Sequence, residues 1–191
     1  RTEIEHFLNE RPETVLVIDE AYAGFIPEFQ SAFELTDQFE NLIVVRSLTK
    51  CCAIPGLRLG YAIASEKLVA KLRKFQQPWS VNTLAQFAGK FLIENDISNR
   101  LDSREIMELS QNLQESIDQL DGFRVVRSQA PFFLVEMETG TAAGLKEFLI
   151  QQYGILIRNA ANFRGLNERF FRVCTRNEAD NALLLNGLNA Y

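Results

Sequence analysis

The chain has 191 residues, of which 47% are hydrophobic and 24% charged, and it carries a formal net charge of −5. This acidic balance, without a basic patch, argues against a nucleic-acid partner, because phosphate contacts need clustered lysine and arginine. No apolar run approaches the length of a membrane span, and the charged start has no signal-peptide core, so we expect no membrane partner and a cytoplasmic protein. Three cysteines and one histidine form neither a disulfide framework nor a metal site.

The first third of the chain alternates helical and strand patterns. Helical spacing of apolar residues predicts a helix over 1–11, and continuous apolar runs predict strands over 15–18, 42–45 and 59–64. All three strands are apolar enough to be covered on both faces. Such strands need neighbours and covering helices, and the chain supplies too few upstream. We therefore expect a fragment whose N-terminal half is missing.

The rest of the chain predicts a helical connector followed by a second core. Ser65 can cap a helix that Pro78 interrupts, and Asn82 can cap another. An amphipathic helix over 106–120 ends at Gly122. Strands are then expected over 123–127, 132–137, 155–158 and 170–173, with helices over 141–152 and from 177. We predict an α/β domain over 1–80, a connector over 81–100 and a small α+β domain over 101–191.

A lysine stands where an open α/β sheet usually binds ligands. Lys50 follows the strand 42–45, and a lysine at the C-terminal end of a strand can form an imine with an aldehyde. Asp19, at the end of the first strand, needs a buried cationic partner or a hydrogen-bond donor, and a protonated pyridine nitrogen would satisfy it. These two residues together indicate pyridoxal 5'-phosphate, a cofactor that also needs a donor to its phenolic oxygen and anion ligands for its phosphate.

Three further residues complete that set of ligands. Tyr22 can donate to the phenolic oxygen, while Ser47 and the guanidinium fork of Arg58 can bind the phosphate. Gly56 is expected to let the backbone bend toward Arg58. Taken singly, these residues are more often a solvated charge, a helix cap or a packing residue. Their joint spacing favours the cofactor site.

The motifs that carry this chemistry resemble a known family. Asp19-Glu20-Ala21-Tyr22 and the segment from Ser47 to Tyr61 resemble the aspartate aminotransferase-type, fold type I pyridoxal-phosphate enzymes, and the resemblance covers the whole chain. Within that family, segments 78–82, 155–158 and 158–166 most resemble the L-threonine O-3-phosphate decarboxylases of cobalamin biosynthesis. Histidinol-phosphate aminotransferases are the next relatives. The resemblance makes residues 1–80 the C-terminal part of a three-layer α/β/α cofactor-binding domain.

The resemblance also implies a role for each matching residue. Lys50 would be the catalytic lysine that forms the imine, Asp19 the partner of the ring nitrogen, Tyr22 the donor to the phenolic oxygen, and Ser47 and Arg58 the phosphate ligands. The parent enzyme would be a homodimer. Its substrate would be a small phosphorylated amino acid.

Two arginines are implied as the substrate ligands. Arg172 is expected at the α-carboxylate and Arg158 at the substrate phosphate, because two guanidinium forks can separate two anionic groups by position. The alternative is an ordinary salt bridge at the end of a strand. If the arginines hold the carboxylate perpendicular to the cofactor ring, carbon dioxide leaves the substrate imine and aminopropanol phosphate forms. If they hold it near the ring plane, an aminotransferase results.

Two departures from the family pattern affect the function expected of this chain. Relatives carry aromatic residues just after the lysine, whereas this chain has Cys51-Cys52, which could loosen packing or expose a thiol to the aldehyde. The missing N-terminal half would supply the residue that stacks on the ring and much of the phosphate loop. We therefore expect a weak cofactor binder without turnover. A hypothesis of another class is a non-catalytic fragment that keeps the fold for association.

Overall fold

The structure is a computed structural model that describes residues 2–95 and 101–191. It divides into two compact units, residues 1–101 and residues 102–191. None of the helices in the described part of the chain is long and apolar enough to cross a membrane.

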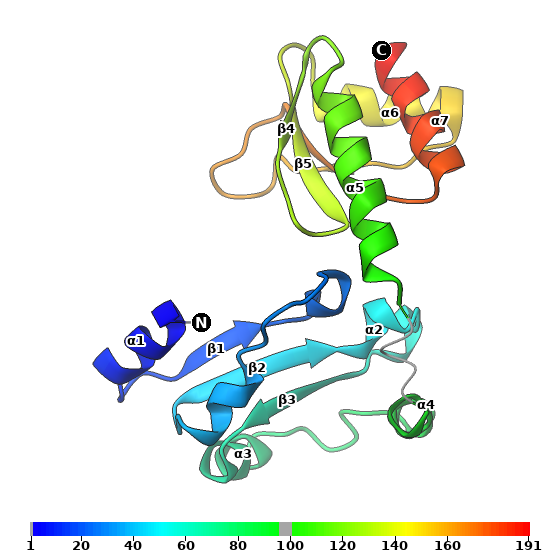
Figure 1. Cartoon of the computed structure of the whole chain (residues 1–191). Coiled ribbons are helices and arrows are strands. Elements are labelled where there is room, and N and C mark those ends of the chain that lie inside the picture. Colours follow the sequence, from blue (N-terminus) through cyan, green and yellow to red (C-terminus); the bar gives the residue numbers. More distant parts are fainter. Residues whose placement is uncertain (1, 96–100) are drawn as a thin grey trace. The chain divides into compact units, whose positions relative to one another are not determined.

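The first unit contains a three-stranded sheet and several short helices (Figure 1). Its strands are β1 (Leu16–Asp19), β2 (Leu42–Ser47) and β3 (Gly60–Ala64). Its helices are α1 (Thr2–Glu10), α2 (Leu48–Cys51), α3 (Glu66–Arg73) and α4 (Thr83–Glu94), with 3-10 turns η1 (Ala23–Phe25), η2 (Phe33–Asp37) and η3 (Pro55–Leu57). The sequence located all three strands and the four α-helices except α2, to within a few residues.

The sheet of the first unit is mixed. β1 pairs parallel to β2, with Asp19 opposite Val45, and β3 pairs antiparallel to β2, with Gly60 opposite Ser47. Gly60 is required at this position, because a Cβ there would lie 2.7 Å from the carbonyl oxygen of Arg46. This pairing brings the residues that flank the lysine loop together at one end of the sheet.

One face of this sheet is packed and the other is partly open. On the packed face, apolar side chains from α1, η2 and the strands form a buried cluster. Its members are Leu8, Ala32, Leu35, Leu42 and Val44. The expectation that all three strands are covered on both faces is wrong for this chain, because Val17 is 56% exposed and β3 is exposed over its first three residues. Within residues 2–95, Val17 therefore keeps more than half of its surface exposed.

A buried carboxylate connects the strands to the loop between them. Glu20, directly after β1, is 4% exposed and forms an ion pair with Arg46 of β2 at 2.8 Å. It also accepts hydrogen bonds from Ser31 Oγ at 2.6 Å and from the Ala32 backbone N–H at 2.7 Å. The carboxylate is therefore fully satisfied, which is the condition under which a protein tolerates a buried charge.

The two predicted helix caps of the first unit are confirmed. Ser65 Oγ accepts from the backbone N–H of Leu68 at 3.4 Å, and Asn82 Oδ1 accepts from that of Ala85 at 2.9 Å. The first of these helices ends at Arg73, before Pro78 is reached.

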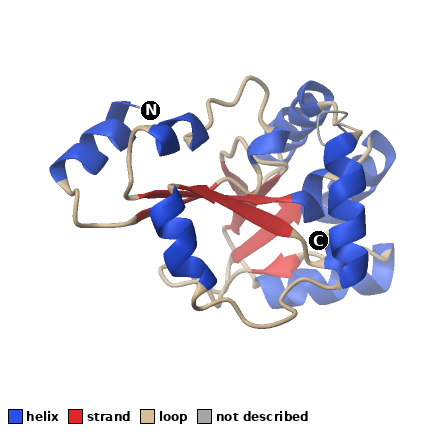
Figure 2. Cartoon of the chain, turned by 90° about the horizontal axis from the view of Figure 1, so that it is seen from below, coloured by secondary structure: helices blue, strands red, loops and turns tan. Residues whose placement is uncertain are grey.

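The second unit combines a four-stranded antiparallel sheet with three helices (Figure 2). The helices are α5 (Ser103–Asp118), α6 (Ala142–Tyr153) and α7 (Glu178–Asn189). The strands are β4 (Phe123–Val126), β5 (Phe132–Met137), β6 (Arg158–Asn159) and β7 (Phe170–Cys174), arranged in the order β4-β5-β7-β6. α6 packs against α7, and α5 packs against β4 and α7.

Buried and more exposed side chains alternate along the strands of the second sheet, so the sheet has one buried face and one more exposed face. Phe133 and Val135 of β5 are buried, and they pair with Val173 and Phe171 of β7, which are buried as well. These side chains form one core with the helices. The helical contribution comes from Leu113, Ile117, Ala142, Leu145, Leu149, Leu184 and Leu188. The residues between the buried ones, Arg172 included, lie on the opposite face of the sheet.

The predicted strand over 155–158 is wrong in its first three residues. Gly154 ends α6 in the left-handed conformation, at φ 67°, and the N–H of Ile155 donates to the carbonyl of Leu149 at 3.1 Å. This helix-capping hydrogen bond uses the backbone donor that a strand would need. Pairing with β7 therefore begins only at Arg158.

We predict that Glu20→Gln destabilises the chain by about 3 kcal/mol, because it leaves Arg46 without its charge partner inside the protein. Urea unfolding followed by circular dichroism measures this change. The matched control is Glu40→Gln, which removes the exposed pair between Glu40 and Lys67 and should leave the free energy of unfolding unchanged. Equal stability of the two variants would contradict the structural role of Glu20.

Candidate active site

Lys50 lies where the sequence predicted, just beyond the C-terminal end of a strand. β2 ends at Ser47, and Lys50 is the third residue of the short helix α2. Ser47 Oγ caps this helix by accepting the backbone N–H of Thr49 at 3.3 Å. The Lys50 ammonium donates to the same Ser47 Oγ at 3.4 Å. The helix cap thus fixes the hydroxyl that contacts the lysine.

Tyr22 lies on the other side of the lysine. The Lys50 Nζ atom is 5.1 Å from the centroid of the Tyr22 ring, within range of a cation–π contact. Tyr22 follows β1 by three residues, and Asp19 is the last residue of that strand. The Asp19 carboxylate accepts the backbone N–H of Ala21 at 2.8 Å, which fixes the turn between strand and tyrosine. The structure therefore brings Lys50, Ser47 and Tyr22 into contact, with Asp19 at the end of the neighbouring strand.

Arg58 is held in a strained backbone conformation. Its φ of 57° and ψ of 50° are left-handed, a conformation that is unfavourable for a residue with a Cβ. Its guanidinium donates to the carbonyl of Pro55 at 3.0 Å, and no contact joins it to Ser47 or Lys50 within residues 2–95. The expectation that Gly56 provides the bend is wrong. Gly56 lies inside η3, and the left-handed residues of this loop are Ala53 and Arg58.

The charges of these residues suit an anionic ligand with a protonated ring. Within residues 2–95, neither the Lys50 ammonium nor the Arg58 guanidinium forms an ion pair with a carboxylate, and the Asp19 carboxylate has no cationic partner. A phosphate group could bind these cations and the Ser47 hydroxyl. A pyridinium nitrogen could donate a hydrogen bond to the Asp19 carboxylate. The side chains present therefore fit the group that the sequence predicts.

Arg158 and Arg172 are cross-strand neighbours in the second unit. They are directly paired in the register of β6 and β7, and each guanidinium lies over an aromatic ring, Phe163 for Arg158 and Phe132 for Arg172. Like charges placed opposite one another in a sheet destabilise it unless an anion lies between them. Both arginines line a cavity of about 480 Å³. They form a candidate site for an anion, and their individual roles stay predictions.

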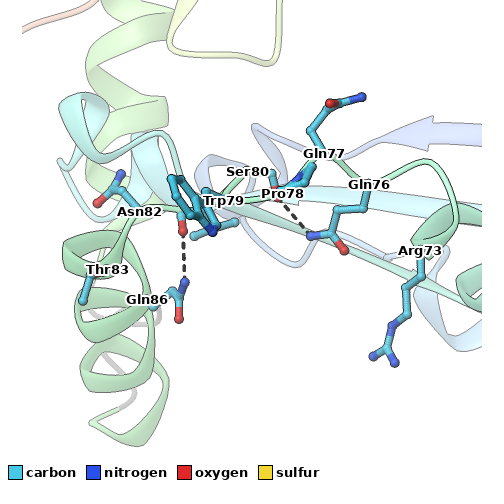
Figure 3. Close-up of a pocket in the computed structure, with 10 residues that line it drawn as sticks. Arg73, Gln76, Gln77, Pro78, Trp79, Ser80, Asn82, Thr83 and Gln86 are labelled. Atoms are coloured by element: carbon cyan, nitrogen blue, oxygen red, sulfur yellow. Dashed lines mark hydrogen bonds between the residues drawn. The ribbon is translucent and has the colours of Figure 1, made fainter.

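The motif Pro78-Trp79-Ser80-Val81-Asn82 lines a separate hollow of about 910 Å³ (Figure 3). The Trp79 side chain is 97% exposed, and its backbone has a φ of 60°. Asn82 donates from its side-chain amide to the carbonyl of Leu57 at 3.2 Å. The motif is thus bonded to the residue that precedes Arg58, although none of the predicted site residues lines this hollow.

The sequence interpretation missed Glu20 and Arg46 as supports of the site. A signal was present, since Glu20 stands next to Asp19 and adjacent residues of a strand point to opposite faces. The parallel register continues past Asp19, because the N–H of Glu20 donates to the carbonyl of Val45 at 2.8 Å. This register places Glu20 beside Arg46, the residue directly before Ser47.

The chain belongs to the class I and II aminotransferase family, whose family model matches residues 2–188. Among curated relatives, it is 35% identical over 174 residues to a threonine-phosphate decarboxylase of Salmonella typhimurium, covering 91% of this chain and 47% of that protein. It is 33% identical over 174 residues to histidinol-phosphate aminotransferase 1 of Carboxydothermus hydrogenoformans, covering 91% of this chain and 48% of the relative. The chain spans about half the length of these relatives.

A solved structure matches the same fold. The L-threonine-O-3-phosphate decarboxylase of Porphyromonas gingivalis superposes with a TM-score of 0.93 at 36% identity, over 100% of this chain and 58% of that one. The predicted fold class, an α/β protein of the fold type I pyridoxal-phosphate family, is therefore confirmed, and so is the family resemblance.

The two thiols after the lysine have an unusual environment. Burial, together with the hydrogen bond and charge of Cys51, raises the pKa of the Cys52 thiol to about 11 from an ordinary 9.0. Alkylation requires the thiolate. We predict that iodoacetamide alkylates Cys52 with a rate that still rises about tenfold per pH unit between pH 8 and 10, as measured by peptide mass spectrometry. A plateau below pH 9.5 would contradict this environment.

Proposed function

We propose that this chain carries the lysine-bearing part of a pyridoxal 5'-phosphate site, with Lys50 as the residue that bonds the cofactor covalently. The family to which the chain belongs consists of enzymes that use this cofactor. When bound, the cofactor supplies a conjugated ring that accepts the electron pair released at the α-carbon of the substrate. The observation that carries the proposal is the placement of Lys50 between the Ser47 hydroxyl and the Tyr22 ring.

Each of the other residues has a defined task in this proposal. Tyr22 donates a hydrogen bond toward the phenolic oxygen, and Asp19 holds the proton on the ring nitrogen, which strengthens electron withdrawal. Ser47 and Arg58 bind the phosphate, and Arg58 is free to turn toward it because its present hydrogen bond, to the carbonyl of Pro55, is exposed. Loss of Asp19 would remove much of the electron sink while leaving the covalent bond to Lys50 possible.

For the parent protein, we propose decarboxylation of a small phosphorylated amino acid, L-threonine O-3-phosphate, in cobalamin biosynthesis. The paired guanidinium groups of Arg158 and Arg172 support a substrate with two anionic groups, one carboxylate and one phosphate. The identity to threonine-phosphate decarboxylases supports this substrate. The alternative is a histidinol-phosphate aminotransferase, which the second relative favours at nearly the same identity.

For the chain by itself, we propose weak cofactor binding without turnover. Residues 2–95 supply the lysine, the tyrosine and the ring-nitrogen acid, and the chain spans about half the length of its relatives. The parent would act as a cytoplasmic homodimer. The alternative of another class is a non-catalytic fragment that keeps the fold for association, and the partly open face of the first sheet favours it.

Lysine labelling tests the cofactor site. The chain is incubated with pyridoxal phosphate, reduced with borohydride and mapped by peptide mass spectrometry. We expect the label at Lys50 to exceed that at the exposed Lys67 at least tenfold, because Ser47 and Tyr22 position only Lys50. Lys67→Ala should leave the total label nearly unchanged and Lys50→Ala should abolish most of it. Equal labelling of all lysines, or none at Lys50, would favour the non-binding fragment.

Activity of the full-length parent tests the reaction. We expect carbon dioxide release from L-threonine O-3-phosphate, and an Arg158→Gln variant should raise the KM for this substrate at least tenfold because one anion contact is lost. Amino transfer from histidinol phosphate to 2-oxoglutarate, without decarboxylation, would instead support the aminotransferase. Steady decarboxylation by the 191-residue chain alone would contradict its proposed inactivity.

A further inference from the structure

Two adjacent cysteines next to Lys50 have no role in the proposed function. The Sγ atoms of Cys51 and Cys52 are 3.7 Å apart, and both residues are half-buried, so the sulfurs face each other while reagents can still reach them. Cys174, the third thiol, is exposed and belongs to the second unit. The chain therefore holds one thiol pair and one isolated thiol.

Cys51 lies beside both of the segments that contact the lysine. Cys51 is the last residue of α2, and its Sγ donates to the carbonyl of Ser47 at 3.6 Å. On its other side is η1, the turn directly after Tyr22, where a Cβ built on Gly24 would lie 3.7 Å from the Cβ of Cys51. Cys52 caps the helix by donating its N–H to the carbonyl of Leu48 at 3.2 Å. A ligand on this pair would thus contact the support of Lys50.

The short Cα–Cα distance between adjacent residues limits which bonds two neighbouring thiols can form. A trans peptide bond holds adjacent Cα atoms about 3.8 Å apart, whereas disulfides usually need about 4.4–6.8 Å. A direct S–S bond between Cys51 and Cys52 would therefore be strained. A soft atom that bonds both sulfurs leaves them further apart and avoids this strain. Thiol sulfur is itself a soft donor that prefers such atoms.

We propose that Cys51 and Cys52 form a dithiol site for a trivalent arsenical, an electrophile that bonds both sulfurs at once. In its hydrated form the arsenical carries two hydroxyl groups. Two As–O bonds break, two As–S bonds form, and each thiol proton leaves with a hydroxyl as water. The oxidation states of arsenic and sulfur do not change, so no oxidant or reductant is needed.

The environment of Cys52 disfavours ordinary alkylation at neutral pH. Burial and the neighbouring Cys51 raise the pKa of Cys52 to about 11, so the thiol keeps its proton at neutral pH. Reagents that attack a single thiolate therefore react slowly at Cys52, while a reagent that condenses with two thiols can engage the pair.

Phenylarsine oxide tests the site, with intact-mass spectrometry and thiol counting as readouts. We expect one adduct per chain that consumes two of the three thiols, resists excess glutathione and is removed by dithiothreitol. Cys51→Ser and Cys52→Ser should each lower the glutathione-resistant adduct at least tenfold, whereas Cys174→Ser should leave it unchanged. Circular dichroism checks that each variant is folded. The proposal would be overturned if Cys51→Ser and Cys52→Ser both retained the adduct, or if Cys174→Ser lost it.

A second readout connects the dithiol site to Lys50, and it rests on the proposed function. We expect the adduct to lower borohydride-trapped pyridoxal label at Lys50 at least threefold, because Cys51 gives up its hydrogen bond to the Ser47 carbonyl. Unchanged labelling in the adduct would overturn this connection. Absence of label before any arsenical is added would refute the proposed function instead, while the mass and thiol counts would still decide the dithiol site.

Discussion

The ion pair between Glu20 and Arg46 is the contact on which the arrangement of the candidate site depends. Burying a carboxylate is costly unless its oxygens are paired and hydrogen-bonded, and Glu20 meets this condition with Arg46, Ser31 and the N–H of Ala32. These contacts join the ends of β1 and β2 to each other and to the loop that carries Ser31 and Ala32. Glu20 adjoins Asp19, and Arg46 adjoins Ser47, so this ion pair lies beside candidate site residues from both strands.

The charged residues that support the candidate site are paired with an opposite charge, whereas the charged residues that would contact a ligand are not. Glu20 and Arg46 neutralise each other, partly out of solvent. Among the described residues 2–95, Lys50 has no carboxylate partner. In the second unit, Arg158 and Arg172 are paired across two strands, and each guanidinium lies over an aromatic ring. Uncompensated charges of this kind favour anion binding at both places, and they carry more weight for function than the paired ones.

The sequence singled out candidate site residues and located most secondary-structure elements, but it did not identify the residues that support the candidate site. Apolar runs located the strands, and the small polar residues Ser65 and Asn82 located helix starts, because both signals are local. Whether Val17 is covered and in which direction β3 pairs depend on segments far away in the sequence, and no local pattern specifies either. Glycine is the usual left-handed residue, which favours Gly56 for the bend before Arg58, yet Arg58 itself adopts that conformation. Glu20 lies inside the motif Asp19-Glu20-Ala21-Tyr22, and nothing in that motif indicates that its carboxylate is buried.

The dissociation constant of pyridoxal phosphate in the full-length parent tests the central claim most directly. The claim is that Glu20, which is buried among Arg46, Ser31 and Ala32, positions the residues that bind the cofactor. Glu20→Gln should raise this dissociation constant at least tenfold, equivalent to about 1.4 kcal/mol, in protein that remains folded, while the exposed Glu40→Gln variant keeps the original value. Equal cofactor affinity in the two variants would contradict the account.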